Sequence, residues 1–158
     1  MRVRQVVLAV LAAVLWVPQL SAQVEISRAA VVAAMNVERA ARHLPPLRED
    51  SRLDAAAGDR VRDMLTFRYW AHVAPDGRSP FDVFTPRGYV FLSAAENLAA
   101  GYDSLERLIA GWMGSRGHRA NILSAEYEDC GVAILEGNSE HPSWRGKSVV
   151  VLFGKARR

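Results

Sequence analysis

Apolar residues recur at helical spacing in the first half of the chain. One predicted helix covers residues 26–44, and Pro45 ends it because a proline disfavours helical backbone in the residue before it. A second predicted helix begins near Asp50. The inner face expected for the first helix is Ile26, Ala30, Ala33, Val37, Ala40 or Ala41, and Leu44. The inner face expected for the second is Leu53, Ala57, Val61, Met64 and Leu65, with Asp54, Asp59, Arg60, Arg62 and Asp63 mostly outside.

A third helix is predicted after Asp103, which with Glu106 resembles a capping box in which Asp103 is the N-cap. Gly114 and Gly117 interrupt this helix, and residues 118–123 are expected to form another turn. Its apolar stripe follows the i, i+3, i+4, i+7, i+8 pattern of a half-buried helix. The stripe consists of Leu105, Leu108, Ile109, Trp112 and Met113.

The remaining segments predict loops and strands. Residues 67–87 contain several prolines and aromatic residues, which indicates a long structured loop with a short helical turn at 81–84. Residues 90–100 follow neither the helical period of 3.6 residues nor the strand period of 2. Residues 131–136 and 147–153 are rich in β-branched side chains and predict a hairpin with a long connection. Helices first and strands last predict an α+β fold, with helices packed over a small antiparallel sheet.

The start of the chain is typical of an export signal. Arg2 and Arg4 precede the apolar run 6–17, and Leu20-Ser21-Ala22 is a plausible cleavage site. This order predicts a signal peptide over residues 1–22, and a single domain over 23–158; a retained N-terminal anchor is the alternative. The apolar run is too short to span a bilayer comfortably. We therefore expect secretion, either periplasmic or extracellular, and no stable membrane span in the mature protein.

Composition argues against nucleic acid as a partner. Without residues 1–22 the chain has 18 basic and 17 acidic side chains. It therefore lacks the excess of positive charge that is typical of nucleic-acid-binding domains. Cys130 is the only cysteine, which excludes an intrachain disulfide. Because Cys130 begins a β-rich run, we expect a buried and inert thiol.

Three residues could carry chemistry: His72, Glu96 and His118. Imidazole and carboxylate bind a borderline divalent cation or move a proton near neutral pH. Their spacing matches no local motif such as H-E-x-x-H, so a shared site depends on the fold. Glu96 has a structural alternative, in which it orients a histidine or accepts backbone N–H bonds. Ser115 lacks the surroundings of a G-x-S-x-G nucleophile and is expected to cap a helix or support the His118 turn.

Several strings, taken in order, resemble the CAP superfamily, and more closely its cysteine-poor bacterial branch of SCP-like extracellular domains. Asn36 and Arg39 resemble the N..R element of the first helix, and Trp70-Ala71-His72 resembles the string that supplies a cavity histidine. Ala95-Glu96-Asn97-Leu98-Ala99 resembles G-E-N-(I/L)-A. Residues 112–123 resemble W-M-x-S-P-G-H-R-x-N-I-L. The resemblance covers residues 30–155.

This resemblance implies a three-layer α-β-α sandwich with a solvent-open cavity of two histidines and one or two glutamates. In this sequence the cavity residues would be His72, Glu96 and His118, with Ser115 beside them. The second glutamate of the eukaryotic branch is missing, because Ser115 is followed directly by Arg116, Gly117 and His118. The residue that replaces it cannot be identified from sequence.

The function favoured is a non-enzymatic binding module for a cation, a lipid-like molecule or a cell-envelope ligand. No cofactor is certain; His72 and His118 would hold a weakly bound divalent cation such as zinc. The alternative is a metal-assisted hydrolase in which Glu96 is the base, with His118 among its metal ligands. The oligomeric state stays open. An apolar ligand could lie between loop 67–90 and helix 104–114 on residues that could equally be core, namely Phe81, Phe84, Tyr89, Phe91 and Leu92.

Overall fold

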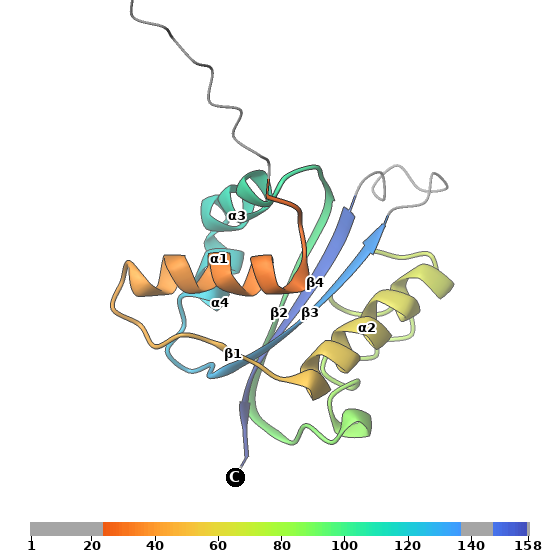
Figure 1. Ribbon diagram of the computed structural model, residues 1–158. Helices are drawn as coiled ribbons and strands as arrows, with labels where there is room; N and C mark the ends of the chain where they lie inside the picture. Colours follow the sequence, from red (N-terminus) through yellow and green to blue (C-terminus); the bar gives the residue numbers. More distant parts are fainter. Residues whose placement is uncertain (1–23, 137–146, 158) are drawn as a thin grey trace, which may run out of the picture.

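A computed structural model describes residues 24–136 and 147–157 (Figure 1). The predicted signal peptide, residues 1–22, and the long hairpin connection lie outside these ranges. In chain order the elements are α1 (Arg28–Ala40), β1 (Arg48–Glu49), α2 (Ser51–Thr66), the 3-10 helix η1 (Thr85–Arg87), β2 (Phe91–Tyr102), α3 (Leu105–Gly114), α4 (Arg116–Ile122), β3 (Asp129–Glu136) and β4 (Lys147–Ala156).

The four strands form one sheet in the order β1-β3-β4-β2. The predicted hairpin is confirmed, because β3 and β4 pair antiparallel with Cys130 opposite Phe153. Residues 90–100, for which the sequence pattern indicates no single element, mostly form β2, a long edge strand antiparallel to β4. The two-residue β1 pairs parallel with β3, so the sheet is mixed rather than purely antiparallel.

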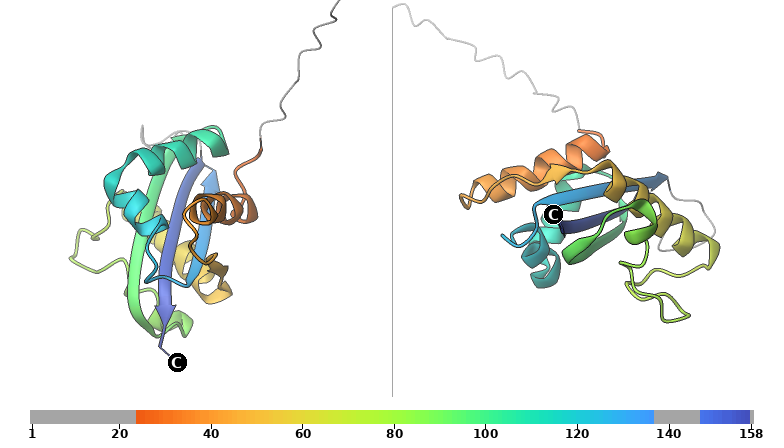
Figure 2. Two further views of the ribbon diagram at one scale, coloured as in Figure 1. Left: turned by 90° about the vertical axis from the view of Figure 1, so that its left-hand side faces the viewer. Right: turned by 90° about the horizontal axis from the view of Figure 1, so that it is seen from below.

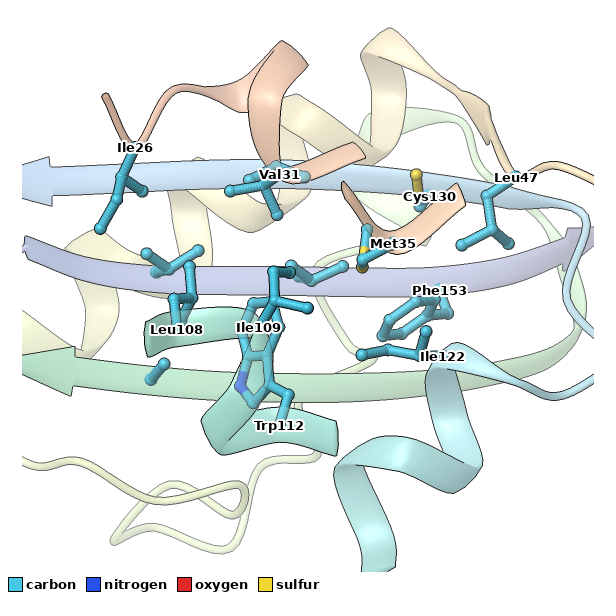
Figure 3. Close-up of a cluster of buried hydrophobic side chains, with 14 of the residues drawn as sticks. Ile26, Val31, Met35, Leu47, Leu108, Ile109, Trp112, Ile122, Cys130 and Phe153 are labelled. Atoms are coloured by element: carbon cyan, nitrogen blue, oxygen red, sulfur yellow. The ribbon is translucent and has the colours of Figure 1, made fainter. Parts of the chain in front are cut away.

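Helices cover both faces of the sheet, which confirms the three-layer arrangement. Helix α2 lies on one side, and α1, α3 and α4 lie on the other (Figures 1 and 2). Figure 3 shows the core on the α1/α3/α4 side, where Trp112 of α3 and Ile122 of α4 point at the strands. Among the described helices, none combines the length and apolarity needed to cross a bilayer.

The buried face of α1 differs from the prediction. Val31, Met35 and Arg39 face inward, whereas Val37 is 68% exposed. Alanines dominate the helix and carry little directional signal, so the larger Val31 and Met35 decide which side packs. Burial of Arg39 is compensated by hydrogen bonds from its guanidinium to three backbone carbonyls, those of Pro45, Ile122 and Ser124.

The structure corrects one smaller expectation, the N-cap of α3, and decides one open alternative, the place of Phe84 and Tyr89. The N-cap of α3 is Ser104, not Asp103: the Ser104 hydroxyl accepts from the Arg107 N–H at 3.3 Å. Asp103 instead pairs with the Arg107 guanidinium at 3.0 Å. The rings of Phe84 and Tyr89 are fully buried, so they belong to the core and do not line a ligand site. Cys130 is buried as predicted, and burial raises the pKa of its thiol to about 12.

Candidate functional site

The site is built around the middle of the edge strand β2. Glu96 lies opposite Leu152 of β4 and is only 5% exposed. Helix α4 is fastened to the same strand by amide side chains: Asn121 Nδ2 donates to the Glu96 carbonyl at 3.2 Å, and Asn97 Nδ2 donates to the His118 carbonyl at 3.1 Å. These bonds bring the segment that carries His118 next to the strand that carries Glu96.

His72 reaches Glu96 from the loop that follows α2. The chain leaves the helix through Arg68, whose φ of 54° is left-handed. His72 Nδ1 then lies 2.7 Å from Glu96 Oε1. The His72 side chain is 55% exposed, whereas that of Glu96 is 1% exposed. The carboxylate therefore sits behind the imidazole and the ring faces solvent.

Arg60 of α2 is a residue of the site that the sequence analysis does not identify. The pattern predicts an outside position, but Arg60 is 2% exposed, and its Nε donates to Glu96 Oε2 at 2.9 Å. Its Nη2 donates to the His72 carbonyl at 2.6 Å. A signal is present, because Arg60 stands seven residues after Leu53 on the inner stripe of α2. Arg60, rather than a second acid, is the charged partner of Glu96.

The two histidines have pKa values displaced in opposite directions. The hydrogen bond to Glu96 raises the pKa of His72, against the opposing effect of partial burial. Partial burial lowers the pKa of His118, and the charge of His72 lowers it further. Of the expected cavity residues, His72 and Glu96 are in direct contact, and the charge of His72 acts on His118.

Ser115 forms the junction between α3 and α4. Its backbone N–H donates to the Gly111 carbonyl at 3.2 Å, and its carbonyl accepts from the Arg119 N–H at 2.9 Å. Ser115 occupies the N-cap position of α4, but its hydroxyl makes no capping hydrogen bond. Ser115 thus stands at the end of one helix and the start of the next and supports the His118 turn, as expected, but through its backbone rather than its hydroxyl.

If the site holds a cation, imidazole nitrogen and not the Glu96 carboxylate would be the ligand. With Glu96 as acceptor, a neutral His72 carries its proton on Nδ1, and the Nε2 lone pair is available to a metal. Both Glu96 oxygens are already engaged, by His72 and by Arg60. Within residues 24–136 and 147–157, no group of three or more His, Cys, Asp or Glu side chains is placed to hold a metal ion.

Comparison with known proteins places this geometry in a family. The sequence profile described as "CAP: Cysteine-rich secretory protein family" matches residues 32–152. The protein YkwD of Bacillus subtilis (strain 168) is 37% identical over 109 residues, which cover 69% of this chain but 42% of YkwD. The membrane protein YlbC of the same organism is 30% identical over 99 residues, which cover 63% of this chain and 29% of YlbC. The chain thus spans less than half the length of these relatives.

Solved structures share the fold. An outer surface protein from Borrelia burgdorferi superposes with a TM-score of 0.70 at 22% identity, covering 80% of this chain and 90% of that one. An extracellular protein containing an SCP domain from Bacillus anthracis gives a TM-score of 0.67 at 23% identity, covering 81% of this chain and 40% of that one. At these identities the likeness concerns the fold alone.

Proposed function

Because the chain belongs to the cysteine-rich secretory protein (CAP) family, we propose that it is a secreted, non-enzymatic binding module. In this proposal His72 and His118 hold a divalent cation such as zinc. The observation that carries the proposal is the state of Glu96: its buried carboxylate is bound by Arg60 Nε at 2.9 Å and by His72 Nδ1 at 2.7 Å. Glu96 therefore acts as the group that orients His72.

The two histidines differ in how they suit this role, because the raised pKa of His72 favours its protonated form, which binds no metal. The carboxylate behind His72 fixes which ring nitrogen carries the proton, as in the carboxylate–histidine pairs that support metal ligands. The lowered pKa of His118 favours the neutral imidazole, which is the form that binds a metal. Imidazole suits zinc. Water would fill the remaining positions, so we expect weak binding.

A metal-assisted hydrolase is the less favoured function. It requires a carboxylate that can accept a proton from bound water. The Glu96 carboxylate is 1% exposed and lies between a guanidinium and an imidazole, which leaves it poorly placed for that task. This arrangement supports binding over hydrolysis.

Secretion and a single CAP domain over residues 23–158 are part of the same proposal. The predicted signal peptide at residues 1–22 supports export. The structural relatives described above as an outer surface protein and an extracellular protein are consistent with that location. A cell-envelope ligand would fit the same location.

A lipid-like ligand is a second candidate, favoured by one surface feature. A groove of roughly 360 Å³ lies between α1 and α3, with mostly apolar walls. Glu38 and Glu106 also line it, which disfavours an anionic headgroup and favours an uncharged ligand. Its apolar lining is Ala34, Val37, Leu105, Ile109, Ala110 and Met113. The uncharged dye Nile red should bind the protein, and Val37→Glu should abolish its fluorescence gain. Val90→Glu, a control at an exposed position outside the groove, should not.

The cation proposal is tested by calorimetric titration of zinc into chelator-treated mature protein. We expect heat of binding in the wild type and none in the double variant His72→Ala/His118→Ala. Circular dichroism of the double variant should match the wild type. Equal heats in the two proteins, or no heat in either, would refute the proposal.

A further inference from the structure

A pocket with a volume of about 420 Å³ lies where the start of α1 meets α2 and η1. Three arginines line it, one from each of these segments: Arg28 of α1, Arg62 of α2 and Arg87 of η1. The pocket contains none of the residues of the candidate functional site. A ligand held there is therefore independent of the cation proposed for the histidines.

The charge that this arginine pocket presents to solvent is positive. The side chains of Arg28, Arg62 and Arg87 are between 41% and 66% exposed. The two carboxylates that pair with them, those of Asp54 and Asp59, are only 13% and 26% exposed. Three exposed guanidinium groups thus surround two largely covered carboxylates, which leaves positive charge available to an anion.

The arginines of the pocket are not saturated by their carboxylates. Asp59 is shared between two of them, because it accepts from Arg87 Nη2 at 2.6 Å and also from Arg62 Nη2. Asp54 accepts from a backbone N–H of β3 at 2.8 Å, and Arg28 Nη1 lies 3.8 Å from it, beyond hydrogen-bond distance. In the part of the chain that the structure describes, the Arg28 guanidinium therefore makes no hydrogen bond.

Gly58 lines the same pocket from the middle of α2, where glycine is less favourable than alanine. Neither packing nor backbone conformation requires a glycine at this position. A Cβ atom there would contact only the end of the Arg62 side chain, at an ordinary 3.5 Å, and the φ of Gly58 is not positive. The missing side chain instead keeps the pocket open, which is a feature that a ligand would need.

We propose that the arginine pocket binds a phosphate ester of a sugar or of another small polyol. A guanidinium offers five N–H donors in a planar fork that matches phosphate oxygens. Three forks from three segments suit the terminal oxygens of a phosphate monoester better than the two oxygens of a carboxylate. The pocket is many times larger than the roughly 30 Å³ that one water molecule occupies, so it has room for the sugar as well.

The polar part of the lining fits the hydroxyl groups of such a ligand. Asp54 is the one acidic residue in the lining, and its carboxylate can accept from a sugar hydroxyl while the phosphate lies on the arginines. The Ser51 hydroxyl, at the start of α2, can both donate and accept. The two ends of the ligand would thus meet groups of different charge.

The test is a calorimetric titration of glucose 6-phosphate into the mature protein at low salt. Glucose 6-phosphate should bind, inorganic phosphate should bind more weakly, and glucose should give no heat. Arg28→Gln and Arg62→Gln should each weaken binding about tenfold or more, as expected for loss of one charge-assisted contact. Arg107→Gln, the control, removes an exposed arginine outside the pocket and should leave the affinity unchanged.

Gly58→Leu separates loss of binding from loss of folding. Leucine is a better helix former than glycine, so this variant should unfold at a higher temperature than the wild type. Its side chain would fill the pocket, so binding of glucose 6-phosphate should be lost. Undiminished binding by Gly58→Leu would overturn the inference. If this variant does not fold, the arginine variants decide, because their side chains are exposed.

Three further results would overturn the inference. The first is that wild-type protein gives no heat with glucose 6-phosphate. The second is that Arg107→Gln loses as much affinity as Arg28→Gln, which would show a general effect of charge. The third is that the protein binds vesicles of phosphatidylglycerol but not the sugar phosphate, which would assign the arginines to a membrane surface.

Discussion

The guanidinium of Arg60 and the carboxylate of Glu96 form a buried ion pair 2.9 Å long, directly behind the exposed imidazole of His72. Buried ion pairs contribute little net stability against apolar replacements, but breaking one by removing a single partner is costly. The pair therefore makes the position of His72 depend on residues from α2 and β2, which lie 36 positions apart in the sequence.

Removing one member of this pair should destabilise the fold more than removing both. Glu96→Ala removes the nearer counter-charge of buried Arg60 and leaves only Asp63 at 3.7 Å, and we expect a loss of about 3 kcal/mol in the free energy of unfolding. The double variant Arg60→Met/Glu96→Leu should recover most of that loss. Urea denaturation measures both values. Equal losses in the single and double variants would contradict the ion-pair account.

The histidines should titrate on opposite sides of the ordinary value of 6.5. The Glu96 hydrogen bond raises the pKa of His72, so its stabilising effect is full below pH 6.5 and is lost as the pH rises through the folded-state pKa. Burial lowers the pKa of His118, so its effect runs the other way: stability is lost as the pH falls from 6.5 through the folded-state pKa.

NMR titration of the imidazole resonances measures both pKa values. Glu96→Gln removes the charge that favours protonated His72, so the pKa of His72 should fall toward or below 6.5 in that variant. A His72 pKa that does not respond to this substitution would show that the 2.7 Å contact between His72 Nδ1 and Glu96 Oε1 is not formed in solution.

The N-cap of α3 can be assigned by two neighbouring substitutions. Ser104→Ala removes the hydroxyl that accepts from the Arg107 N–H, which should cost about 1 kcal/mol of unfolding free energy. Asp103→Ala removes only an exposed ion pair and should cost less than about 0.5 kcal/mol. Thermal or chemical denaturation measures both losses. A larger loss for Asp103→Ala than for Ser104→Ala would show that Asp103 is the cap.

Gly131 allows the close approach of α2 to β3. A Cβ atom there would lie 2.1 Å from the backbone carbon of Leu53, so the backbones would have to move apart. We expect Gly131→Ala to cost more than about 2 kcal/mol of unfolding free energy. Gly114, at the end of α3, has open space around it, so Gly114→Ala should be neutral or stabilising by up to about 1 kcal/mol. Similar stabilities for the two variants would argue against this packing.

Much of the fold is accessible from sequence because its signals are local. The structure confirms the apolar stripes predicted for α2 and α3 from helical spacing. It also confirms the predicted β3–β4 hairpin. The strings around His72 and Glu96 also mark residues that do meet. Asn36 is the one uncharged polar residue of α1, and its amide exchanges two hydrogen bonds with the Leu47 backbone.

The errors arise where a distant partner decides the outcome. Arg60 and Arg39 are charged, and the sequence pattern assigns neither to the core, because burial of arginine is favourable only when acceptors are in place. Those acceptors come from β2, from the loop at Pro45, and from the end of α4 and the loop after it, which the local sequence does not reveal. The inward prediction for Val37 is wrong because alanine-rich helices give weak directional information.

The most direct test of the site is a crystal structure of the zinc-loaded protein, with zinc located by its anomalous scattering. We predict one ion within about 2.0–2.1 Å of a ring nitrogen of His72 and of His118, with Arg60 still paired to Glu96. An ion coordinated by the Glu96 carboxylate with Arg60 displaced, or no ion near either histidine, would contradict the account.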